Sequence, residues 1–162
     1  MSSLKTIIFI IIIGSASQGF AQTNSITITN ADNKTTTFSL DDMRSFPQTI
    51  LNVEGEDGVN HNYSGVDLYT LLSKAGVSFG KDVRRQTLTS YMLIKAADNY
   101  SVVYALTEVD SFFSGKKIIL AFLKDDQPLT PNFGPLQIIA TGEKKHARLI
   151  RQVTEIDIRK VQ

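Results

Sequence analysis

His61 and Tyr63 are among the few side chains of this sequence that could do chemistry, and both lie in the polar loop from Gly58 to Tyr63. An imidazole titrates near neutral pH, so His61 could contact an anion or act as an acid or base. Tyr63 could help to line a pocket for a flat ring. The alternative is a solvated loop histidine beside a packing tyrosine, and the residue types leave both interpretations open.

Basic side chains gather at one place near the C-terminus. The cluster consists of Lys144, Lys145, His146, Arg148 and Arg151. Ammonium and guanidinium groups form charge-assisted hydrogen bonds, so the cluster could bind a phosphate, a sulfate or an anionic polysaccharide. It could equally be an exposed connection whose charge is balanced by acidic residues elsewhere.

Carboxylates occur in three short groups, Asp41-Asp42, Glu54-Gly55-Glu56-Asp57 and Asp125-Asp126. A glycosidase pair must face across a cleft, whereas adjacent residues in turns point apart. The second group lacks the spacing of a calcium-binding loop. A G-x-S-x-G motif, a glycine-rich phosphate loop and an H-E-x-x-H motif are also missing from the sequence. We therefore predict no catalytic residue and no metal ligand.

The composition excludes several classes of protein. The 162 residues include 17 Lys and Arg against 16 Asp and Glu, and no Cys. Without a basic surplus, nucleic-acid binding is not expected. Without Cys, the chain can have no disulfide, no Cys-ligated zinc and no thiolate-ligated molybdenum.

Residues 1–21 have the pattern of a secretory signal peptide. Lys5 supplies a positive charge, Ile7–Ile13 a short apolar run, and Gly19-Phe20-Ala21 a small-x-small cleavage site. Removing 21 of the 162 residues leaves 141, which we expect to form one domain, residues 22–162. An uncleaved anchor or a buried strand is the alternative. No later window approaches the roughly 18 apolar residues that span a membrane, so we expect an extracytoplasmic protein, periplasmic or secreted.

Short strands dominate the rest of the sequence. Alternating or continuous apolar runs predict strands over residues 25–30, 35–40, 50–53, 89–96, 100–106, 117–123, 136–141 and 153–158. The predicted fold class is α+β, with one mixed β-sheet system and short helices packed on it.

Three short helices are expected between these strands. Ser39 and Asp42 start one, which Pro47 must end. The clearest helix spans residues 67–76, with leucines on one face. Thr107 followed by Asp110 predicts a capping box for a third helix.

Six motifs follow one another between about Ile50 and Ile158. The longest is Y-S-G-V-D-L from Tyr63, followed by L-L and then A-G-V at residues 75–77. The others lie at residues 97–100, 119–122, 125–129, 134–139 and 150–156. Their order resembles that of the oxidoreductase molybdopterin-binding domain, the family of sulfite oxidase. The resemblance implies the fold of that domain and a cleft for a molybdopterin cofactor.

The sequence departs from this family at the cofactor site. The family cysteine whose thiolate binds molybdenum corresponds to Asn52, and an amide is too weak a donor to replace it. Arg151 takes the place of a family lysine and Gln137 that of an arginine, so only part of the anion cradle remains. Molybdopterin is thus implied by resemblance only, and we expect no bound cofactor.

We therefore predict an exported ligand-binding or accessory module without molybdenum redox catalysis. Its remnant cleft would be lined by Asn52, His61, Tyr63, Arg148 and Arg151. It would meet a small anionic ligand or a protein partner. Two alternatives stay open: an oxidoreductase component that uses the pterin cofactor without a protein thiolate, and a structural or adhesive exported domain that shares only the fold.

Overall fold

The computed structural model of the protein describes residues 24–161. The expected signal peptide, residues 1–21, lies outside the described residues. Within them, no helix has both the length and the apolar character needed to cross a membrane.

Ten strands are the main elements of the described chain. They are β1 (Ser25–Thr29), β2 (Thr35–Ser39), β3 (Gln48–Glu54), β4 (Asn60–Asp67), β5 (Ser90–Ala96), β6 (Ser101–Ala105), β7 (Ile118–Lys124), β8 (Gln127–Pro128), β9 (Gln137–Ala140) and β10 (Val153–Lys160). The helices are α1 (Leu40–Arg44), α2 (Leu68–Lys74) and α3 (Arg84–Leu88), with single turns η1 (Lys81–Val83), η2 (Leu106–Glu108) and η3 (His146–Arg148).

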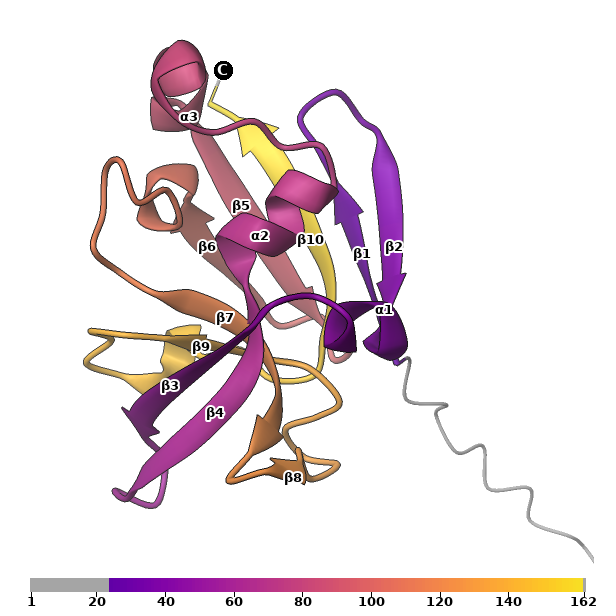
Figure 1. The fold of residues 1–162 in the computed structure, drawn as a ribbon, viewed down its shortest axis with the longest axis vertical. Coiled ribbons are helices and arrows are strands. Elements are labelled where there is room, and N and C mark those ends of the chain that lie inside the picture. The colour runs from indigo at the N-terminus through magenta and orange to yellow at the C-terminus, as the bar shows by residue number, and fades with distance from the viewer. Residues whose placement is uncertain (1–23, 162) are drawn as a thin grey trace, which may run out of the picture.

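The strands divide between two sheets, where the sequence predicts one (Figure 1). Sheet A has the order β2-β1-β10-β5-β6, and its central pair, β1 and β10, is parallel. Sheet B is antiparallel, with the order β3-β4-β7, and the far edge of β7 pairs with both β9 and β8. The α+β class and its mixed sheet are therefore confirmed.

The main core lies between sheet A, helix α2 and one face of sheet B. Its fully buried members include Ile28, Ile94 and Ile156 from sheet A, Leu68 and Leu72 from α2, and Leu120 and Ile138 from sheet B. The opposite face of sheet B carries a second, smaller cluster made of Leu51, Tyr63, Ile119, Ala121 and Ile139. Both faces of β7 are thus covered, which explains its continuous apolar sequence.

The first two predicted helices are confirmed at their N-terminal ends. The Ser39 hydroxyl accepts a hydrogen bond from the Asp42 N–H at 3.1 Å, and the Asp42 carboxylate accepts one from the Ser39 N–H at 2.8 Å. This reciprocal pair is a capping box. At α2, the Asp67 carboxylate accepts from the Tyr69 N–H at 2.8 Å, and Gly76 has the positive φ of 84° that suits a helix end.

Gly65 explains one of the sequence motifs. It lies in β4 at a register shift against β7. A Cβ atom at this position would come within 2.6 Å of the Ala121 Cα and would overlap the Leu120 carbonyl oxygen. The glycine therefore permits the close approach of two backbones at the centre of sheet B.

The predicted capping box at Thr107 and Asp110 is wrong. The turn η2 forms instead, and its Glu108 carboxylate accepts a hydrogen bond from the Ala105 N–H at 3.0 Å. Asp110 is buried and accepts from the Gly80 N–H at 3.1 Å, so it joins two loops. Its carboxylate also accepts from the Phe112 N–H at 2.9 Å, so Asp110 begins a turn at residues 111–113 and no helix.

Candidate functional site

A cleft opens on the face of sheet B that carries the smaller apolar cluster. Its walls are the β3–β4 loop, the β7–β8 turn with β8, and the segment that leads into β9. These elements lie at the lower end of the molecule in Figure 1, away from α3. The cleft has a volume of about 510 Å³, within the usual range for small-molecule sites. We call it the acidic cleft, because Glu56, Asp57 and Asp125 stand on its walls.

The floor of the acidic cleft is apolar except for one amide. Tyr63, Ile139 and Leu149 line it and are buried. Gln137 lies beside them on the same face of β9 as Ile139, and is 6% exposed. Its Nε2 donates to the Leu149 carbonyl at 3.4 Å, whereas its buried Oε1 has no hydrogen-bond partner among residues 24–161. Buried acceptors without a donor are rare, so this oxygen offers an unused hydrogen-bonding position.

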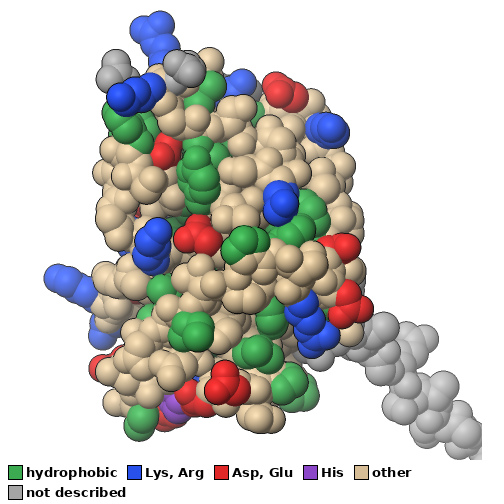
Figure 2. Space-filling view, viewed as in Figure 1, with side chains coloured by type: hydrophobic (Ala, Val, Ile, Leu, Met, Phe, Trp, Pro, Cys, Tyr) green, Lys and Arg blue, Asp and Glu red, His purple; other side chains and the backbone are tan. Residues whose placement is uncertain are grey.

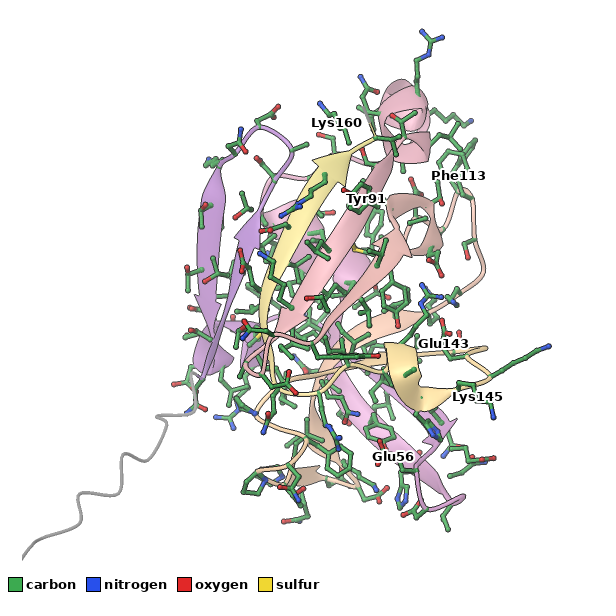
Figure 3. All side chains as sticks on the ribbon, turned by 180° about the vertical axis from the view of Figure 1, so that it is seen from behind. Glu56, Tyr91, Phe113, Glu143, Lys145 and Lys160 are labelled. Atoms are coloured by element: carbon green, nitrogen blue, oxygen red, sulfur yellow. The ribbon has the colours of Figure 1, made fainter. Side chains whose placement is uncertain are left out.

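The rim of the acidic cleft is negatively charged. Three carboxylates, those of Glu56, Asp57 and Asp125, stand beside the Lys124 ammonium and the His61 ring. Carboxylates gather with a histidine at this end of the molecule in Figure 2, and Figure 3 places Glu56 at the same end, opposite Lys160. Glu56 is exposed and forms no ion pair within the described residues. Its charge is therefore uncompensated by the protein. Glu54 also borders the cleft, but it alternates with Val53 along β3, so its side chain lies on the opposite face of sheet B.

His61 lies between two of these carboxylates. Its Nδ1 is 2.6 Å from Asp125 Oδ2, and its Nε2 is 2.9 Å from Asp57 Oδ2. An ionised carboxylate can only accept, so both ring nitrogens must donate, which requires the imidazolium form. The hydrogen bonds to Asp57 and then to Asp125 accordingly raise the pKa of His61 above its ordinary value of 6.5. His61 thus ties the β3–β4 loop to the β7–β8 turn.

Lys124 and Tyr63 form a second contact at the rim. The Lys124 ammonium lies 5.9 Å from the centroid of the Tyr63 ring and 3.8 Å from the Asp57 carboxylate. Burial, assisted by Asp57 and Asp125, raises the pKa of the Tyr63 hydroxyl. Tyr63 therefore presents a neutral ring to the cleft, with a cation already beside it.

Asn52 faces away from the acidic cleft. In the β3–β4 register it pairs with Asn62, whereas the neighbouring pairs are Leu51 with Tyr63 and Val53 with His61. Successive strand residues point to opposite faces, so Asn52 lies on the other face of sheet B from Tyr63 and His61. Its Nδ2 donates to Asn62 Oδ1 at 2.8 Å, and it borders a separate groove of about 500 Å³ beside η3.

Arg148 is held in an ion-pair network outside the acidic cleft. Its guanidinium donates to Glu143 at 3.0 Å and to Glu108 at 2.8 Å, and Lys116 contacts the same two carboxylates at 2.6 and 2.8 Å. The guanidinium also lies 3.9 Å from the centroid of the Tyr104 ring. Burial alone would raise the pKa of Glu108, but the bonds from Lys116 and Arg148 bring it below its usual value. The positive charges of Lys116 and Arg148 are therefore neutralised by the negative charges of Glu108 and Glu143.

Arg151 is exposed and packs on a wall residue of the acidic cleft. Its guanidinium carbon lies 5.4 Å from the ring centroid of Phe133, which lines the cleft. Of the five predicted site residues, Tyr63 lines the acidic cleft, and His61 and Arg151 contact its walls. Asn52 and Arg148 face other surfaces. The five therefore do not converge on one cavity, and a role for them in ligand binding stays a prediction.

The acidic cleft could not be predicted from the sequence, because its walls come together only through strand pairing. The carboxylates of residues 54–57 and 125–126 looked like separate turns. They meet because β4 pairs with β7, which places Asp125 next to Asn62: its carboxylate accepts from the Asn62 N–H at 2.9 Å. No local signal in either turn reveals this pairing. Even so, the described residues contain no group of three or more His, Asp or Glu side chains that could hold a metal ion.

Comparison with known proteins adds information on the fold. No protein-family model matches the chain, and no curated protein sequence matches it. Among solved structures, it is similar to the sulfane dehydrogenase SoxCD from Paracoccus pantotrophus, with a TM-score of 0.66 and 18% sequence identity. The match covers 87% of this chain and 39% of that chain, so this chain spans about two fifths of its neighbour. The likeness shows the fold alone and confirms the predicted sulfite-oxidase-type α+β class.

Proposed function

We propose that the protein is a ligand-binding module built on a sulfite-oxidase-type fold, and that it performs no molybdenum redox chemistry. The observation that carries this proposal is the side chain at position 52. Where the resemblance expects a metal-binding thiolate, Asn52 presents an amide whose nitrogen is already used in a hydrogen bond to Asn62. A neutral amide neither holds nor tunes a redox metal as a thiolate does.

The remaining residues also do not fit an anionic pterin cofactor. A cofactor phosphate needs uncompensated cations around it. Arg148 is instead neutralised by Glu108 and Glu143. Arg151 is a single exposed cation, and Lys144 is a single cation on the groove that Asn52 borders. The acidic cleft would repel a phosphate. No reaction step is therefore assigned to this cofactor.

The acidic cleft favours a binding module over a purely structural or adhesive domain. A domain that shares only the fold needs no cavity with polar walls. Here a cavity of about 510 Å³ combines an apolar floor with charged walls and an unpaired amide oxygen. Such a combination of apolar lining and few polar groups is typical of small-molecule sites.

Metal and pterin analysis tests the proposal. The full chain would be expressed with the molybdenum cofactor pathway active, and its molybdenum measured by elemental analysis. We expect no metal above background and no pterin fluorescence after denaturation. Stoichiometric molybdenum, or an extractable pterin, would overturn the proposal in favour of an oxidoreductase component.

The variant Asn52→Cys serves as the matched control, because it restores the thiolate and nothing else. We expect this variant to stay free of molybdenum too, since Arg148 is neutralised by Glu108 and Glu143 and Lys144 is a single cation on the groove that Asn52 borders. Molybdenum in the variant alone would contradict the argument from the cations and support the argument from the thiolate.

We also propose an extracytoplasmic location, which the pattern of residues 1–21 supports. Cell fractionation should then find the protein outside the cytoplasm, and N-terminal sequencing should begin at Gln22. A cytoplasmic protein that retains Met1 would contradict this.

A further inference from the structure

We propose that the acidic cleft binds an organic ammonium ion with an apolar body and a hydrogen-bond donor at its far end. The ammonium group would face Glu56, and the donor would reach the Oε1 atom of Gln137. This inference rests on the proposed binding function and names the ligand class for it.

The floor of the cleft requires a donor. Gln137 is 6% exposed, and its Nε2 is used by the Leu149 carbonyl. A carbonyl oxygen can only accept, so this contact fixes which amide atom is the nitrogen and leaves Oε1 as an acceptor. That oxygen has no donor within residues 24–161. A ligand O–H or N–H would satisfy it, whereas a ligand acceptor would add repulsion.

The rim of the cleft requires a positive charge. Asp57 and Asp125 are both engaged by His61, and Asp57 also lies near Lys124. Glu56 has no such partner in the described part of the chain, so the rim keeps one uncompensated negative charge. An anion would meet this carboxylate without compensation. A cation would be attracted to it.

The space between rim and floor suits an apolar body. Tyr63, Leu129 and Phe133 supply aromatic and aliphatic surface on the lining. The Lys124 ammonium beside the Tyr63 ring shows that a cation is accommodated next to this surface. The negative charge lies at the rim and the free acceptor lies at the floor. The cleft therefore favours a ligand with an ammonium group at one end and a hydrogen-bond donor at the other.

Four related probes separate these requirements. Tyramine carries an ammonium, a ring and a hydroxyl donor at opposite ends. Phenethylamine lacks the hydroxyl, 4-hydroxyphenylacetate replaces the ammonium by a carboxylate, and tyrosol replaces it by a neutral hydroxyl. Binding of each probe to the full chain would be followed by NMR titration of the backbone amides. We expect tyramine to shift amides of residues 54–57 and 124–130, and to bind roughly tenfold more tightly than phenethylamine.

Two variants assign the contacts. Gln137→Met keeps the length of the side chain and removes the acceptor, so it should abolish the difference between tyramine and phenethylamine. Glu56→Gln removes one rim charge and should weaken both amines by about two- to fivefold. Asp41→Asn makes the same charge change on α1, away from the cleft, and should leave both affinities unchanged.

Tighter binding of 4-hydroxyphenylacetate than of tyramine would overturn the proposal and support the anionic ligand that the sequence predicts. Binding of no probe, or equal binding of tyramine by the protein and by Gln137→Met, would also overturn it. Native-state amide spectra of each variant show whether it is folded. The molybdenum measurement is independent of all these results, so the two proposals can fail separately.

Discussion

Arg148 and Tyr104 hold each other at two points. The guanidinium of Arg148 lies 3.9 Å from the Tyr104 ring centroid, and the Tyr104 hydroxyl donates a 2.6 Å hydrogen bond to the carbonyl oxygen of the same arginine. Tyr104 is fully buried in the main core. Since Arg148 belongs to η3, this pair attaches the segment before β10 to sheet A.

Tyr104→Phe should destabilise the protein, because it leaves the Arg148 carbonyl without its donor. The expected loss is about 1–2 kcal/mol in the free energy of unfolding, measured by urea denaturation. Tyr100→Phe is the control: its hydroxyl donates to the Ala147 carbonyl at 3.0 Å on an exposed surface, where water can replace it. Equal losses for the two variants would contradict the special role of Tyr104.

Glu143→Gln should be more damaging than a similar change on the surface. The Glu143 side chain is 11% exposed and accepts from both Lys116 and Arg148. Removing its charge leaves two cations against Glu108 alone, with an expected cost of about 1.5–3 kcal/mol. Glu155→Gln loses a single, more exposed pair with Lys95 and should cost less than about 1 kcal/mol. Comparable unfolding midpoints for the two variants would contradict the claim that the ion pairs of Glu143 stabilise the protein more than the pair between Glu155 and Lys95.

The pKa of His61 should lie above 6.5, because Asp57 and Asp125 favour its charged form. A raised pKa in the folded state means that His61 contributes stability below pH 6.5, and that this contribution is lost as the pH rises through the raised value. NMR titration of the imidazole would measure it.

Asp57→Asn should lower this pKa, since it removes the first of the two carboxylates. Asp126→Asn is the matched control, because Asp126 is a neighbouring acid with no described contact to His61. A pKa of His61 at or below 6.5 in the unaltered protein would show that its hydrogen bonds to Asp57 and Asp125 do not form in solution.

Gly65→Ala should destabilise sheet B strongly. The new methyl group would meet the backbone of Leu120 and Ala121, which cannot rotate away as a side chain could. We expect a loss of about 3 kcal/mol or failure to fold. Gly115→Ala, whose Cβ would meet nothing within 4 Å, should be neutral or stabilising by about 0.5 kcal/mol. Thermal denaturation of both variants would distinguish the two positions.

Local patterns predict most elements of this fold, but they miss β4, whose first residues look like a loop, and the short β8. They predict the pairing between elements poorly. The capping box at Ser39 and the leucine face of α2 are short-range signals, and both are confirmed. α3 is missed because its residues, R-R-Q-T-L, show no apolar periodicity and its N-cap makes no side-chain hydrogen bond. The division into two sheets depends on contacts between distant strands, which no local pattern encodes.

The candidate site illustrates the same limit. The sequence singles out His61 and Tyr63 as lining residues of a cleft but places both in a loop, whereas the structure has them in strand β4. It also places Asn52 with them, although strand alternation puts that side chain on the opposite face. Arg148 looks like a free cation in sequence, because its partner Glu108 is 40 positions away.

The central position of β10 in sheet A affects how the chain must fold. β10 is the last strand, yet it lies between β1 and β5 and pairs with both. Until it is in place, β1 and β5 each expose an unpaired edge that could pair with another chain. Sheet A is therefore complete only when β10, near the C-terminus, has paired with β1, near the start of the described chain. Contacts between residues so far apart in sequence slow folding. Loss of the final residues should cause aggregation before it affects the acidic cleft.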